Sequence, residues 1–156
     1  MYSRILLTTK TAEEAQLLLG EVRLLEDSLY INDGFELVLA EKLRRSMAAL
    51  IREEIGGATL SERKKFLEGL RQVILAAQRL ELSLADDPSE VFLERISSWV
   101  KQNLGAEILL DIHYDPRLVG GAVVSFRGKY ADYSVKKRLG EWFNQKKDVN
   151  SLLESK

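Results

Sequence analysis

The first residues in this sequence that could do chemistry are an aspartate and a histidine. Asp111 and His113 alternate along the segment EILLDIHY, so their side chains would share one face of a strand. An Asp-x-His pair can orient an imidazole for general base catalysis, which makes a small hydrolase one hypothesis. No serine stands in a G-x-S-x-G sequence that would mark it as the nucleophile. A solvated histidine on a strand face is therefore the favoured interpretation.

The second chemical candidate is the pair Gly120 and Gly121 in the segment DPRLVGGAVVSF. Glycine-rich loops bind phosphate where they lead into the N-terminus of a helix. The apolar run that follows these glycines predicts a strand instead, so the helix N–H donors would be missing. We expect the glycines to give the backbone freedom where that strand begins. If Gly121 has a positive φ, a β-branched residue at this position would be strained.

Two charged segments carry weaker alternatives. In DDPSE, Asp87 is predicted as the N-cap of a helix with Pro88 at its first position, rather than as a metal ligand. The segment KLRRSMAAL could bind nucleic acid or anionic lipid as a basic helix, although a solvated helix face is the favoured interpretation. Its cationic side chains are Lys42, Arg44 and Arg45.

Composition excludes several classes of site. The chain has no cysteine and one histidine, which excludes disulfides, thiolate metal sites and multi-histidine metal sites. The net charge is −1, and a nucleic-acid-binding protein normally has a basic surface. We therefore expect no cofactor, no metal and no nucleic acid.

The N-terminal segment does not have the pattern of a signal peptide, because its apolar run is only Ile5 to Leu7. No run approaches the ~20 apolar residues of a membrane helix. We expect a soluble, intracellular protein that works at a membrane only if another protein holds it there.

Residues 1–80 are predicted to form a helical bundle of three amphipathic helices. Capping-box patterns open the first helix at Thr11 and the third at Thr59, each with a glutamate three residues later. The turn INDG separates the first two helices, and a second helix is predicted from about residue 35 to 55. Mutual packing of the apolar stripes is favoured, and the alternative is a groove left open for a partner helix.

Residues 81–147 are predicted to form a small α/β domain, and residues 148–156 a polar tail. The pattern indicates a strand at 80–84, a helix, and then two strands on either side of the glycine pair. A tight connection at Gly128 and Lys129 leads to a last strand. The expected apolar face of the helix is Val91, Phe92, Ile96, Trp99 and Val100, and that of a terminal helix after Ser134 is Val135, Leu139, Trp142 and Phe143.

The expected fold class is thus α+β: an N-terminal helical bundle, then a small α/β C-terminal domain with a short β-meander and a terminal helix. The residue types and their spacing indicate no active site on this fold. They indicate a protein that works by binding partners.

One ordered set of residues also carries a family resemblance. The set consists of Asp115, Pro116, Leu118, Gly120, Gly121, Gly128, Asp132, Ser134, Arg138 and Leu139. The sequence from 80 to 143 resembles the C-terminal part of the delta subunit of F-type ATP synthase, called the oligomycin-sensitivity-conferring protein in mitochondria. That family shows a strand leading to Asp-Pro-x-Leu-Ile-Gly-Gly, an apolar strand, a Gly turn, and Asp-x-Ser before a helix with Arg-Leu.

The resemblance implies a peripheral-stalk, or stator, subunit that does no chemistry. In the family, the N-terminal helical domain grips the N-terminal helices of alpha subunits on the catalytic head, and the C-terminal region joins the b-type stalk. Proton-driven rotation is thereby coupled to ATP synthesis. The implied location is the cytoplasmic face of the bacterial plasma membrane, peripherally, within the F1Fo complex. The family's N-terminal domain usually has six helices, whereas three are predicted here.

The runner-up is the E-type peripheral-stalk subunit of V/A-type rotary ATPases. That family also carries a Gly-Gly strand, a Gly turn and a terminal helix with Arg-Leu, but it usually begins with one long stalk helix. The breaks at INDG and IGG, together with the Asp-Pro, favour delta.

Overall fold

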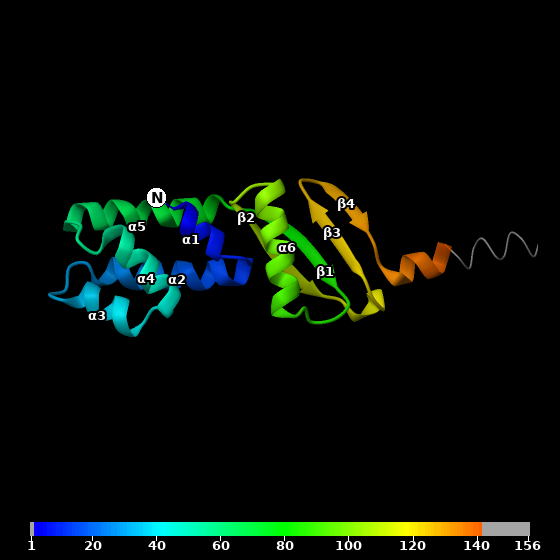
Figure 1. Cartoon of the computed structure of the whole chain (residues 1–156), viewed down its shortest axis with the longest axis horizontal. Coiled ribbons are helices and arrows are strands. Elements are labelled where there is room, and N and C mark those ends of the chain that lie inside the picture. The colour runs from blue at the N-terminus through cyan, green and yellow to red at the C-terminus, as the bar shows by residue number, and fades with distance from the viewer. Residues whose placement is uncertain (1, 142–156) are drawn as a thin grey trace, which may run out of the picture.

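The structure is a computed structural model that describes residues 2–141. Figure 1 shows an elongated molecule with a bundle of helices at one end and a β-sheet in the middle. A helix that begins at residue 135 points away from the sheet at the other end. The predicted Trp142, Phe143 and polar tail lie outside the described residues.

The helical part has more elements than the sequence predicts. Its helices are α1 (Ser3–Thr8), α2 (Ala12–Ser28), α3 (Gly34–Glu41), α4 (Arg45–Ile55) and α5 (Leu60–Ala76). The prediction of three helices is wrong, because five precede the sheet within the described part of the chain.

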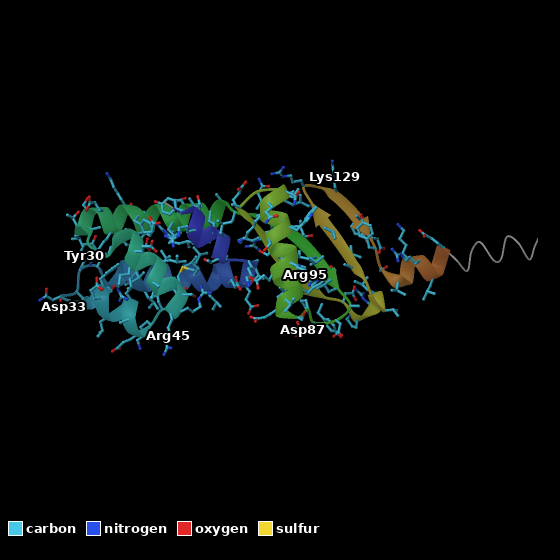
Figure 2. The ribbon with its side chains drawn as sticks, viewed as in Figure 1. Tyr30, Asp33, Arg45, Asp87, Arg95 and Lys129 are labelled. Atoms are coloured by element: carbon cyan, nitrogen blue, oxygen red, sulfur yellow. The ribbon has the colours of Figure 1, made fainter. Side chains whose placement is uncertain are left out.

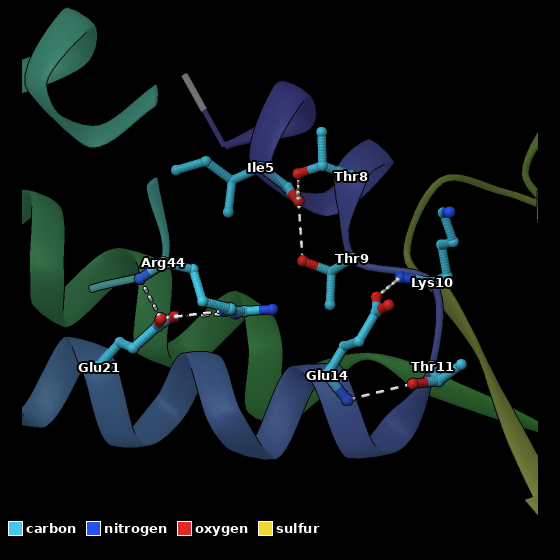
Figure 3. Close-up of polar contacts among 8 residues, drawn as sticks. All are labelled: Ile5, Thr8, Thr9, Lys10, Thr11, Glu14, Glu21 and Arg44. Carbon is cyan, nitrogen blue, oxygen red and sulfur yellow. Dashed lines mark hydrogen bonds and ion pairs between the residues drawn. The ribbon is translucent and has the colours of Figure 1, made fainter. Parts of the chain in front are cut away.

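The predicted second helix is divided into α3 and α4 by a contact made far away in the sequence. Glu21, on α2, accepts hydrogen bonds from the backbone N–H of Arg44 at 2.9 Å and from its Nε and Nη2 at 3.0 and 2.8 Å (Figure 3). A carboxylate from another helix therefore takes the role of N-cap for α4. The break contains neither glycine nor proline, so local patterns do not predict it.

Helix α1 also escaped prediction because it has only six residues. It is held by the bundle rather than by its own propensity. Ile5 is fully buried in the helical core, the rings of Tyr2 and Phe66 lie 5.3 Å apart, and Arg4 pairs with Glu53 at 2.6 Å.

The predicted N-caps Thr11 and Thr59 are confirmed. Thr11 accepts the N–H of Glu14 at 3.1 Å, and Thr59 forms a full capping box with Glu62. The box on α2 differs in one bond, since the Glu14 carboxylate accepts the N–H of Lys10 at 2.6 Å rather than that of Thr11 (Figure 3).

The remaining elements form a mixed sheet with one crossing helix. They are β1 (Gln78–Leu84), α6 (Glu90–Asn103), β2 (Ile108–Tyr114), the short 3-10 helix η1 (Pro116–Leu118), β3 (Ala122–Phe126) and β4 (Lys129–Asp132). The strand order is β2-β1-β3-β4. Strands β1 and β2 are parallel and joined through α6, whereas β3 pairs antiparallel with both β1 and β4.

The α+β fold class is confirmed, with helices first, the sheet second and a helix after it. The expected meander is not formed in full, because β1 lies between β2 and β3. Only β3 and β4 are consecutive antiparallel neighbours within residues 2–141. Sheet order depends on non-local pairing, which the alternation of side chains does not encode.

Strand β2 contributes to both hydrophobic cores. Ile108 and Leu110 lie in the core of the sheet, whereas Leu109 on the other face lies in the core of the helical bundle. The segment before α2 also runs along β2, where the Leu110 N–H donates to the Lys10 carbonyl at 3.0 Å. This strand therefore joins the helical and sheet parts of the molecule.

Two expectations for α6 are wrong. Its N-cap is Ser89 rather than Asp87, because the Ser89 hydroxyl accepts the Phe92 N–H at 3.3 Å. Its expected apolar face is only partly buried: Val100 is in the core, but Val91 and Trp99 are 65% and 59% exposed. A neighbouring stripe that contains Ser97 and Lys101 faces inward instead.

Candidate functional site

The segment DPRLVGG forms the connection between β2 and β3. Its first residue is fixed to the sheet, since the Asp115 N–H donates to the Leu84 carbonyl at 2.8 Å. The Asp115 carboxylate then accepts the backbone N–H of Arg117 at 3.1 Å and the Arg117 Nε at 2.8 Å. The Arg117 side chain lowers the pKa of the Asp115 carboxyl below its usual range. Asp115 and Pro116 therefore shape the turn that begins η1.

The glycine pair is held against the start of the last helix. The Val135 N–H donates to the Gly120 carbonyl at 2.9 Å, and the Tyr133 N–H donates to the Ala122 carbonyl at 2.8 Å. Gly121 has a φ of 78°. A Cβ at Gly121 would lie 3.1 Å from the Ser134 Cα and closer still to the Tyr133 carbonyl oxygen.

Glycine at position 121 thus allows both the left-handed backbone and the close approach of two chain segments. The predicted positive φ is confirmed, and so is the predicted strand after it. The glycines lead into β3 rather than into a helix, so this segment lacks the geometry of a helix-type phosphate loop.

Ser134 begins the last helix as the sequence predicts. Its hydroxyl accepts the Lys137 N–H at 3.2 Å, and its own N–H donates to the Asp132 carboxylate at 2.8 Å. The hydrogen bond from Ser134 lowers the pKa of the Asp132 carboxyl. Asp132 and Ser134 therefore fix the angle at which the chain leaves the sheet, and Val135 fastens that corner to Gly120.

The other predicted residues lie apart from this corner. Gly128 and Arg127 form the two-residue turn between β3 and β4, with φ values of 75° and 50°. Positive φ at both positions suits the right-handed twist of a hairpin. Arg138 and Leu139 lie on the exposed last helix, and Leu118 is half-buried in η1.

A hollow of about 740 Å³ opens beside the DPRLVGG connection. It lies between that connection and the β1–α6 loop, and Gly120 and Gly121 are part of its lining. Its apolar side chains include Phe92, Tyr114 and Val119, which are 42%, 65% and 70% exposed. The sequence did not predict this surface, because Phe92 was expected on an apolar face that the fold would cover.

Val119 holds an unusual conformation at the edge of this hollow. Its φ is 66°, a left-handed value that is a rare and strained choice for a β-branched residue. The strained backbone presents an exposed apolar side chain. Such strain is commonly found at sites that bind a partner.

The chemical alternatives have little support in the geometry. The His113 Nε2 lies 3.5 Å from Asp111 Oδ1, but the His113 side chain is 57% exposed and Asp111 also pairs with Arg79 at 3.6 Å. Asp111 and His113 line a second hollow of about 380 Å³, where the aliphatic hydroxyl is that of Thr11, already bound as the N-cap of α2. The arrangement is a surface ion-pair group without a placed nucleophile.

The charged clusters are also accounted for by structure. Asp86 accepts the backbone N–H of Asp87 at 2.9 Å, and among residues 2–141 no group of three or more potential ligands has metal-binding geometry. Arg44, from the basic segment, is bound to Glu21, which leaves Lys42 and Arg45 on the surface. No helix in the described part of the chain has the length and apolar character to cross a membrane.

The DPRLVGG corner lies within a region that matches a known protein family. Residues 77–145 match the family of ATP synthase delta (OSCP) subunits. The delta/OSCP resemblance read from the sequence is thereby confirmed for this region.

Particular relatives can then be named. The chain is similar to the ATP synthase subunit delta of Methylobacterium sp. strain 4-46, with 39% identity over 61 residues that cover 39% of this chain and 32% of the relative. It is also similar to the ATP synthase subunit delta of Aquifex aeolicus, with 32% identity over 82 residues, or 53% of this chain and 45% of the relative. The matches therefore span 32% and 45% of the length of these two curated relatives.

Proposed function

We propose that the chain is a non-catalytic peripheral-stalk subunit of an F-type ATP synthase. It would connect the F1 catalytic head to the b-type stalk, so that proton-driven rotation is coupled to ATP synthesis. The observation that carries the proposal is the DPRLVGG corner, whose turn, left-handed glycine and capped last helix lie within the region that matches delta subunits.

The hollow beside Val119 is the surface that we assign to the b-type stalk. Phe92, Tyr114 and Val119 offer apolar area that a helix with an apolar stripe would cover. Asp86 and Asp87 lie on the same lining, so a partner helix with basic residues beside its stripe would fit best.

The helical part supplies a second surface, which we assign to the alpha subunits of the head. Leu17 and Leu24 are seven residues apart on α2, so they lie on one face, and they are 56% and 47% exposed. The N-terminal helices of the alpha subunits would pack along this face. The subunit would then lie at the cytoplasmic face of the bacterial plasma membrane and reach it only through the complex.

Affinity purification from the native host tests the proposal. The tagged full-length chain is expected in the membrane fraction together with F1 subunits and a b-type subunit, identified by mass spectrometry. Recovery with V/A-type ATPase subunits would favour the E-type stalk alternative. If the chain co-purifies with neither F-type nor V/A-type ATPase subunits, the stator proposal is overturned.

The substitution Val119→Gly separates docking from folding. Glycine adopts the left-handed φ without strain, so the free energy of unfolding in urea is expected to rise by about 1 kcal/mol. The same variant loses the apolar side chain at the hollow, so less b-type subunit is expected to co-purify. Val91→Ala is the control, because Val91 is a similarly exposed valine that does not line the hollow. Normal recovery of the b-type subunit with Val119→Gly would contradict the assignment of this surface.

A further inference from the structure

We propose that Lys101 is a clasp that fixes the orientation of the helical bundle relative to the sheet. Lys101 lies on α6, which packs on the sheet, and its side chain reaches the end of α1, which packs on the bundle. The proposal stands on contacts between these parts and does not depend on the stator function.

The ammonium group of Lys101 is saturated by backbone oxygens. It donates to the carbonyl of Leu7 at 2.9 Å and also to the carbonyls of Leu6 and Thr9. The residue is only 9% exposed. The last carbonyls of a helix have no partner within the helix, and they form the negative end of its dipole. One lysine from a different element thus caps the C-terminal end of α1.

The other end of this connection is anchored in the bundle. Ile5 lies in the helical core, and Arg4 pairs with Glu53 on α4. The buried hydroxyl of Thr9 donates to the Ile5 carbonyl at 2.9 Å, which ties the clasped segment back to α1 (Figure 3). Helix α1 is therefore a strut, seated on the bundle and gripped by α6.

The clasp matters because the direct chain connection is short. Helix α5 ends at Ala76 and β1 begins at Gln78, so Ala77 alone joins the bundle to the sheet. Leu109 inserts from β2 into the helical core and attaches the two parts, while Lys10 approaches Glu94 of α6 at 3.9 Å. Lys101 adds a contact from α6 to the C-terminal end of α1, away from Ala77 and Leu109. Together with the Lys10–Glu94 pair and the hydrogen bond from Leu110 to the Lys10 carbonyl, it opposes rotation of the bundle about the line through Ala77 and Leu109.

Removing the ammonium group would take the lysine donor from the carbonyls of Leu7 and Thr9, and it would leave the Leu6 carbonyl with the Thr9 N–H at 3.3 Å. Buried backbone oxygens without partners are costly, so the end of α1 is expected to move toward water. The expected result is a wider range of angles between bundle and sheet, with both cores intact.

Distance measurement between two spin labels tests the clasp. The chain has no cysteine, so Arg45→Cys on α4 and Lys129→Cys on β4 give one label in each part of the full chain (Figure 2). Pulsed electron paramagnetic resonance is expected to give a narrow distance distribution for the parent and a broadened one for Lys101→Met. Arg95→Met is the matched control, since it removes an exposed cation from the same helix, and it is expected to leave the distribution narrow.

A second variant guards against simple loss of folding. Lys101→Gln keeps an N–H donor but is one bond shorter, so hydrogen exchange of the α1 amides is expected to accelerate while the α5 amides stay protected. Unchanged distances together with unchanged α1 exchange would overturn the proposal. Loss of helical circular dichroism in both variants would also overturn it, because the effect would then be global rather than confined to this joint.

Discussion

Gly121, Gly128 and Val119 all have a left-handed backbone, but the contacts around them differ. Gly121 is constrained by its φ of 78° and by the close approach of Tyr133 and Ser134. Gly128 has nearly the same φ, but nothing lies within 4 Å of the position its Cβ would take. Val119 also has a left-handed φ, but it carries a β-branched side chain, so its backbone is strained. Gly121 and Gly128 therefore allow the cost of the left-handed backbone and the cost of the close contacts to be measured separately.

We expect Gly121→Val to destabilise the protein more than Gly128→Val. A β-branched residue in a left-handed conformation costs about 1–3 kcal/mol, and both variants incur that cost. Only Gly121→Val must also displace the Tyr133 carbonyl and the corner at Ser134. Urea unfolding of both variants measures the difference. Equal losses would mean that the corner opens without cost.

At the scale of elements, local signals predicted helix starts better than helix number. Thr11 and Thr59 were found because a cap and its glutamate lie within one turn. The break before α4 was missed because it depends on Glu21, more than twenty residues away. Gly121 and Ser134 of the candidate site were predicted from neighbouring residues, whereas the hollow beside Val119 depends on which face of α6 the sheet covers.

The start of α6 offers a direct test of cap assignment. Ser89→Ala is expected to lower the free energy of unfolding by about 1 kcal/mol, because the Phe92 N–H loses its acceptor. Asp87→Ala is expected to change it by less than about 0.5 kcal/mol, as for surface positions without a specific contact. Thermal or urea unfolding compares the two variants. A larger loss for Asp87→Ala would restore the sequence-based assignment.

For the whole molecule, the buried lysine gives stability a pH dependence with a defined sign. Burial lowers the pKa of Lys101 from 10.5 to about 8, with Lys10 also lowering it and Glu14 opposing the shift. Between pH 8 and 10.5 the unfolded chain holds a proton that the folded chain has released. The free energy of unfolding due to this group therefore rises with pH across that window.

Unfolding curves of the parent and Lys101→Met, recorded from pH 7 to 10.5, measure this effect. Other titrating groups largely cancel in the difference, which is expected to move in favour of the parent as the pH rises. The free energy of unfolding of Arg95→Met is expected to change with pH in the same way as that of the parent. A difference that stays flat would show that Lys101 keeps an ordinary pKa.

We propose that the helical part and the sheet part of the described chain are domains in their pattern of elements but not in their cores. The boundary falls at Ala77, where α5 gives way to β1. Leu109, however, comes from the sheet and lies among the residues of the helical core.

This shared strand has a consequence for synthesis on the ribosome. The five helices emerge first, but their core is complete only when Leu109 has been translated, after the whole of α6. Until then the nascent bundle carries an open apolar gap that a chaperone would recognise. Termination before β2 would release such an unfinished bundle, whereas the arrival of β2 completes the helical core.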